Sequence, residues 1–218
     1  LNSGNNTAEV TYTVYGYKGN VVIPEKVSYN GVEYRVTSIG EYAFYGCRSL
    51  TEVTLPAGIT HVADNLFGNC TSLTTVNLSP ATQSIGTYSF NGCDLLKNID
   101  LSLATLNSIG ASAFRYCLSL EDVTLSNTIT TIGSSAFSRC SNLQTINIPT
   151  GVTELSSSIF SDCPKLEEVT MHNQITAIGS YAFSGCNNLQ NVDLSKAITI
   201  SSSAFENAKG LGEIELTN

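Results

Sequence analysis

The sequence predicts a solenoid in which about eight coils, each roughly 23 residues long, stack through short β-strands and turns. Two spacing patterns support this fold class. The eight phenylalanines recur at intervals of 22 to 24 residues, at Phe44, Phe67, Phe90, Phe114, Phe137, Phe160, Phe183 and Phe205. Each of the 7 cysteines follows a phenylalanine by three residues, and in every copy a leucine lies a further three residues on. A fixed period of this kind indicates that each unit forms one coil.

Each coil is expected to carry a short front strand after its leucine. Two apolar residues separated by one polar residue occupy this place, as in Val123 and Leu125 or Ile146 and Ile148. Alternation with a period of two predicts a half-buried strand. Because every strand restarts after the same return path, the strands should pair in parallel at about 4.8 Å and form a stack roughly 35 to 40 Å long.

A pattern in the return path predicts a second, shorter strand on the opposite side of the coil. The pattern is an apolar residue, two others and then Ile-Gly, as in Ile129 to Gly133. The one-residue gain before Ile109 and the one-residue loss before Ile200 both fall in this connector, where packing is least strict. The following segment, residues 135–140, is too short for a regular helix and predicts a single helical or 3₁₀ turn with Phe137 inward.

The form Leu-x-x-Val-x-Leu at this period is the signature of leucine-rich repeats. The longer consensus Ile-Gly-x-x-Ala-Phe-x-x-Cys-x-x-Leu, which residues 39–50 match best, resembles the BspA-like subclass of that family. The resemblance covers residues 36–218. We expect residues 1–38 to form a strand-rich N-terminal cap and residues 39–218 to form the repeat array, in one continuous domain.

The resemblance implies a bacterial protein, secreted or held at the cell surface, whose relatives are linked to adhesion to host or bacterial surfaces. It also implies that an anchor, such as a lipid, would belong to a segment outside this chain. Relatives of this kind are typical of Gram-negative anaerobes of the mouth or gut. These statements come from the family alone.

The last copy departs from the repeat, since Ser201 replaces glycine and Ala208 replaces cysteine. The chain ends two residues after Leu216, so the final coil lacks a return path. The edge strand of this coil is expected to lie open. The charges of Glu213 and Glu215 would protect that edge from unwanted pairing with other strands. Either the native chain continues, or another molecule covers that end. The covering molecule could be a second copy of this chain in an end-to-end association.

Composition excludes several classes of function. The formal net charge of -8 argues against a duplex-binding or polybasic membrane surface, so no nucleic acid partner is expected. No apolar run reaches the roughly 18 residues of a membrane span. The first seven residues have neither the basic start nor the apolar core of a signal peptide.

Neither catalytic nor metal-binding machinery is visible. The seven cysteines share one slot between inward-facing residues, which predicts buried free thiols; no Cys-x-x-Cys pair exists to hold zinc. The only histidines, His61 and His172, are expected on different sides of the coil. No nucleotide-binding or metalloprotease motif occurs. We therefore expect no enzyme activity, no cofactor and no metal centre.

The solvent-facing side of the front strands is the candidate binding surface. Alternation assigns to it the positions just before, between and just after each apolar pair, and these hold acids but no lysine or arginine. The candidate residues are Glu52, Thr54, Asn77, Asp100, Asp122, Thr124, Asn147, Glu168, Thr170, His172, Asp193 and Glu215. This side is either a solvated polar face, a surface for a basic patch of a protein, or a weak Ca²⁺ site between carboxylates of neighbouring coils.

Two functions fit these observations. The first is a non-catalytic extracellular or cell-surface module for protein binding and adhesion. The alternative is a structural spacer that holds another domain away from the cell surface. The identity of the protein or surface ligand is left open. Seven of the 10 tyrosines, from Tyr12 to Tyr45, gather near the start of the chain, either to pack the cap or to form a binding patch.

Overall fold

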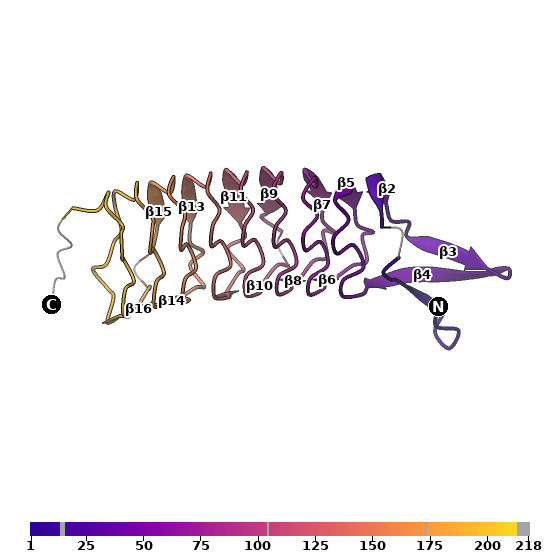
Figure 1. Cartoon of the computed structure of the whole chain (residues 1–218). Helices are drawn as coiled ribbons and strands as arrows, with labels where there is room; N and C mark the ends of the chain where they lie inside the picture. Colours follow the sequence, from indigo (N-terminus) through magenta and orange to yellow (C-terminus); the bar gives the residue numbers. More distant parts are fainter. Residues whose placement is uncertain (14–15, 104, 173, 213–218) are drawn as a thin grey trace.

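The computed structural model describes residues 1–13, 16–103, 105–172 and 174–212. It confirms the predicted solenoid: the coils stack along one axis as a rod, and the N-terminal cap lies at one end (Figure 1). Front strands line one side of the rod and short back strands line the opposite side. Turns join the two sides in every coil.

The front strands are parallel, as predicted. They are β2 (Lys18–Val22), β5 (Ser49–Thr54), β7 (Thr75–Asn77), β9 (Asn98–Leu101), β11 (Asp122–Leu125), β13 (Thr145–Asn147) and β15 (Glu168–Thr170). They pair within three successive groups, which are β2-β5-β7, β9-β11 and β13-β15. Val123 lies opposite Ile99, and Val169 lies opposite Ile146. These side chains are buried, whereas the intervening Thr124 is exposed. Equivalent residues of successive coils therefore form straight rows along the rod.

The back strands are two residues long and also parallel. They are β6 (His61–Val62), β8 (Ser84–Ile85), β10 (Ser108–Ile109), β12 (Thr131–Ile132), β14 (Glu154–Leu155), β16 (Ala177–Ile178) and β17 (Thr199–Ile200). Ile109 pairs with Ile85 and Ile132, and Ile200 pairs with Ile178. The inserted and the deleted residue leave this register intact, because both fall in the connector before the strand.

The prediction of a helical or 3₁₀ turn after the back strand is wrong. The described residues contain no helix, and the segment is a run of turns. Within a coil, the Ala136 amide donates to the Gly133 carbonyl at 3.2 Å. The next amide, of Phe137, donates instead to Ile159 of the following coil at 3.0 Å. Since every second amide is committed to the neighbouring coil, a continuous helical pattern cannot form.

Left-handed backbone makes this alternation possible. Ser135 and Arg139 have φ angles of 58° and 63°, and the equivalent residues of other coils are also positive. A residue in this conformation at the third position of a turn directs the following amide back into its own coil. The position equivalent to Arg139 carries a signal that sequence reasoning missed, because it holds glycine or asparagine, which tolerate left-handed backbone, in five of the eight coils: Gly46, Asn69, Gly92, Gly185 and Asn207.

A dry core runs along the rod. Seven phenylalanines, from Phe44 to Phe183, are fully buried, and consecutive rings lie 5.1 to 5.9 Å apart from Phe44 to Phe205. The rings of Phe90 and Phe114 are nearly parallel, with 3° between their planes. Offset stacking at this spacing adds to the free energy of burial. We call this row the phenylalanine ladder.

The seven cysteines are free and buried, as predicted. From the second coil onward, each thiol also donates to the carbonyl of the preceding coil's phenylalanine. The Sγ of Cys140, for example, lies 3.2 Å from the Phe114 oxygen. The first thiol, of Cys47, instead accepts the amide of Tyr17 at 3.2 Å. Cysteine therefore serves here as a small apolar residue that also carries a weak donor.

The cap closes the N-terminal end of the core. Its sheet contains β1 (Thr7–Val10), β4 (Val32–Ile39) and β3 (Lys26–Tyr29), while β2 joins the front stack beside β5. The ring of Tyr17 covers Phe44, with centroids 4.4 Å apart, and Tyr34 is buried. Tyr12 and Tyr29 are exposed, and Tyr15 lies outside the described residues. Some of the early tyrosines thus pack the cap, and others do not.

Candidate functional site

The solvent side of the front strands, here called the strand face, presents most of the candidate residues. Side chains at the middle of each strand, such as Thr124, Asn147 and Thr170, are exposed. The acids Asp100, Asp122, Glu168 and Asp193 are also exposed, while Glu52 and Thr54 are half-buried and Asn77 is exposed. Glu215 lies outside the described residues. The strand register therefore brings the candidates into rows on one side of the rod.

The position just after the apolar pair is withdrawn from this face in most coils, which corrects the expectation, although Ser102 and Ser195 at the same position are exposed. Ser79 and Ser126 hold this position and are 0% and 5% exposed. The Ser79 hydroxyl donates to the Ala57 carbonyl at 2.6 Å. His172 is half-buried, and its Nε2 lies 2.9 Å from the Pro149 carbonyl oxygen. The chain turns inward here to begin the return path, so these side chains serve the turn.

Polar side chains at the start of the strand face are linked across coils. The Asn77 amide donates to both the Thr54 hydroxyl at 3.0 Å and the Glu52 carboxylate at 3.2 Å. The other oxygen of Glu52 accepts the Asn20 amide at 3.0 Å. The cap and the first two coils thus share one hydrogen-bonded row, which links these side chains across the strands.

Two carboxylates farther along the face are fixed by their own turns. Hydrogen bonds from the side chain and backbone of Ser102 lower the pKa of Asp100, and its Oδ1 lies 2.9 Å from the Ser102 amide nitrogen. Bonds from the backbone and side chain of Ser195 lower the pKa of Asp193 in the same way. Hydrogen bonds to the charged form favour it. Both groups therefore keep their charge into mildly acidic solution.

The histidines lie apart, as predicted. His61 is on β6 at the back of the rod, where its Nδ1 lies 2.7 Å from the Ser84 hydroxyl, and His172 follows β15 at the front. Within the described ranges no three histidine, cysteine, aspartate or glutamate side chains gather as a metal site would require.

Burial makes the thiols poor nucleophiles. Removal from water raises the pKa of Cys70 and of Cys186 to about 12, and it also raises the pKa of Cys140 well above the ordinary thiol value. Because the thiolate is the reactive form, these groups stay protonated and inert at neutral pH. The row of sulfurs is structural.

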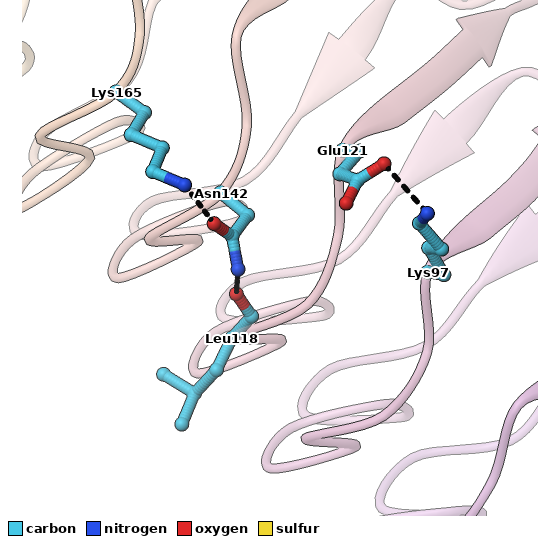
Figure 2. A network of polar contacts seen from close by, with 5 residues as sticks. All are labelled: Lys97, Leu118, Glu121, Asn142 and Lys165. Carbon is cyan, nitrogen blue, oxygen red and sulfur yellow. Dashed lines mark hydrogen bonds and ion pairs between the residues drawn. The ribbon is translucent and has the colours of Figure 1, made fainter.

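Side chains also bridge coils at the edge between turns and front strands (Figure 2). Lys97 pairs with Glu121 of the next coil at 3.0 Å. Lys165 donates to Asn142 at 2.6 Å, and the Asn142 amide donates to the Leu118 carbonyl at 2.8 Å. Exposed pairs of this kind contribute little stability individually. Each of the two lysine contacts engages one of the three N–H donors of its lysine.

Sequence reasoning missed a groove on the turn side of the rod, here called the turn groove. Its volume is about 560 Å³, and it crosses five coils. Its lining residues are Tyr116, Leu118, Arg139, Ser141, Asp162, Pro164, Gly185, Asn187, Asn207 and Lys209. These are the residues that flank the cysteine slot in each copy. Reading those two positions as rows along the repeat would have revealed them.

The stacked coils, paired front strands and buried leucines define a leucine-rich-repeat solenoid. The chain belongs to the family described as the BspA type leucine-rich repeat region, whose model matches residues 25–117 and 107–218 in six copies. The resemblance drawn from the repeat consensus is therefore confirmed. Searching the curated proteins gave no match.

Solved structures agree with this assignment. A leucine-rich repeat protein of T. pallidum is 30% identical, and the match covers 89% of this chain and 87% of that chain with a TM-score of 0.76. One from Bacteroides ovatus is 26% identical, covering 97% and 67% with a TM-score of 0.69. A third, from Eubacterium ventriosum, shares the fold at 21% identity, covering 91% and 60% with a TM-score of 0.70.

Across the described residues, no helix is long and apolar enough to cross a membrane.

Proposed function

We propose that this chain is a non-catalytic protein-binding module that acts in adhesion at a bacterial surface, and that the strand face receives the partner. The observation that carries the proposal is the ordered row of exposed polar and acidic side chains on a rigid parallel stack. Asp122 begins β11 and Glu168 begins β15, both exposed, and Asp100 and Asp193 keep their charge. A surface of this sign suits a basic patch on another protein.

The family supports the location. Proteins with BspA-type repeats are typically associated with bacterial surfaces. In a solenoid the recurring residues form the core and the variable residues lie on continuous faces. Such faces are the usual basis of binding in repeat proteins. The same rod could serve as a spacer, and the strand-face variant described next separates the two functions.

Binding should be measured by surface plasmon resonance against a panel of immobilised extracellular matrix proteins and bacterial surface extracts. We expect at least one specific partner, and Glu168→Gln should weaken that binding several-fold because it removes an interfacial charge. The matched control is Glu154→Gln, which makes the same change on β14 at the back of the rod. A panel without any specific partner would favour the spacer, and equal losses in both variants would contradict the strand face as the binding site.

A further inference from the structure

The turn groove has a charge that differs from the rest of the molecule. The whole chain carries a net charge of -8, yet cations stand at both ends of this groove. Arg139 and Lys209 line it, and Arg115 lies beside its first coil. Asp162 is the acid in the lining, and it pairs with Arg139 at 3.2 Å. Two positive charges are therefore left over in an acidic protein.

Arg115 is the unusual cation of this group. Its guanidinium lies 4.9 Å from the ring centroid of Tyr116, and that of Arg139 lies 5.0 Å from the same ring. The Nε of Arg115 is buried without a hydrogen-bond partner among the described residues. A buried donor without an acceptor costs free energy, so a site with an orphaned arginine fits an incoming anionic group.

The other lining groups can recognise hydroxyls. Side-chain amides of Asn187 and Asn207, the carboxylate of Asp162 and the hydroxyl of Ser141 open onto the groove. Each can donate or accept hydrogen bonds, and Tyr116 with its neighbours adds apolar and aromatic surface. Polar groups of this kind, beside an aromatic ring and an arginine, form a surface for a polyhydroxylated ligand that carries an acid group.

An extended peptide suits the groove less well. The backbone amides along it already donate to the following coil, as Arg139 does to Ser161 at 2.8 Å and Asp162 to Ser184 at 2.7 Å. No row of free amides is left to pair with an added strand, which is how an extended peptide gains most of its affinity at a sheet edge. Recognition must come from side chains, and these recur once per coil.

We infer that the turn groove binds an acidic oligosaccharide, with a carboxylate on Arg115 and sugar hydroxyls on the polar side chains of the following coils. Its five coils span roughly 20 Å at a step of about 4.8 Å. A hexose in an extended chain advances by a similar length, so successive sugars would meet successive coils. This site is separate from the strand face, and neither depends on the other.

The inference is tested by isothermal titration calorimetry with hexagalacturonate as the acidic probe. Maltohexaose serves as the neutral sugar of the same length, and hexaglutamate as the acidic peptide. We expect hexagalacturonate to bind at least tenfold more tightly than either, with an affinity that falls as salt concentration rises. Absence of hexagalacturonate binding, equal binding of maltohexaose or equal binding of hexaglutamate would each overturn it.

The matched variants are Arg115→Gln and Lys97→Gln, which remove one positive charge each. Lys97 lies outside the groove in its pair with Glu121 (Figure 2). Arg115→Gln should weaken hexagalacturonate binding about tenfold, as expected for loss of one charge-assisted hydrogen bond. Lys97→Gln should leave it unchanged. Equal losses would show a general charge effect and contradict the site, and melting curves of both variants verify that they fold.

Discussion

Each buried phenylalanine contributes to stability twice, through its own removal from water and through contact with the rings of both neighbouring coils. Phe137 is fully buried between Phe114 and Phe160, with ring centroids 5.4 and 5.9 Å away. The buried thiol of Cys140 donates to the Phe114 carbonyl, which also accepts the Cys117 amide. At the scale of single residues, the recurring phenylalanine and cysteine therefore pack the interior and link each coil to its neighbour.

Phe137→Ala should lower the free energy of unfolding by about 3 to 5 kcal/mol, because it leaves a cavity in the middle of the phenylalanine ladder. Thr124→Ala, on the exposed side of β11, should change it by less than about 0.5 kcal/mol. Urea denaturation followed by circular dichroism measures both. Similar losses for the two variants would contradict the assignment of inside and outside positions.

Successive coils approach one another so closely that some backbone positions have no room for a side chain. At Gly110, an added Cβ would lie 2.6 Å from the Gly86 carbonyl carbon and from the Thr87 amide nitrogen of the preceding coil. Such contacts are far shorter than normal van der Waals separation. The glycine of the Ile-Gly pattern thus has a packing role here, since it lets one coil pass close to the next.

We expect Gly110→Ala to destabilise the chain by about 1 to 3 kcal/mol, since the neighbouring coil must move to admit the methyl group. Gly58→Ala is the matched control, because nothing lies within 4 Å of the Cβ position at Gly58. Denaturant midpoints of the two variants provide the comparison. A Gly110→Ala protein as stable as the control would show that the coils are less tightly stacked than described.

Much of the element structure could be predicted from the sequence, because inward-facing residues recur with the coil. The alternation that includes Val123 and Ile146 predicted the front strands, and the Ile-Gly pattern that includes Ile132 predicted the back strands. The turns after the back strand were misread, since their geometry depends on amides that bond to the next coil and on left-handed residues such as Ser135 and Arg139. These choices leave no apolar period in the sequence.

The candidate site was predicted only in part for a related reason. Alternation placed the exposed middles of the strands correctly, but it could not show where the strand ends and the chain turns inward. Ser79 and Ser126 were therefore assigned to the surface although they are buried. The turn groove was missed because its lining is defined by stacking between coils, whereas the sequence was read along each coil.

As a whole, the molecule is a rod whose interior contains a row of protonated thiols. Burial raises the pKa of Cys70, Cys93, Cys117, Cys140, Cys163 and Cys186 above the ordinary thiol value of 9.0. In the unfolded chain these groups lose protons near that value, while the folded chain retains them. The stabilisation is thus complete below about pH 9 and is lost as pH rises toward the folded pKa values, about 12 for Cys70.

We therefore expect the free energy of unfolding to fall steeply above pH 9, by up to about 1.4 kcal/mol per pH unit for each buried thiol. Urea midpoints measured across the alkaline range test this. Cys117→Ala should make the free energy of unfolding fall less steeply with pH, by the contribution of one thiol. The substitution also lowers stability at neutral pH. A midpoint that did not change between neutral and strongly alkaline solution would show that the thiols are not buried.

The central claim is that phenylalanine, cysteine and leucine side chains share one continuous dry interior along the rod. Labelling with DTNB under reducing-agent-free conditions tests it directly, because this reagent counts thiolates that reach solvent. At mildly alkaline pH the folded protein should show almost no reactive thiol, and the chain unfolded in guanidinium chloride should show all 7. Rapid reaction of several thiols in the folded protein would contradict the account.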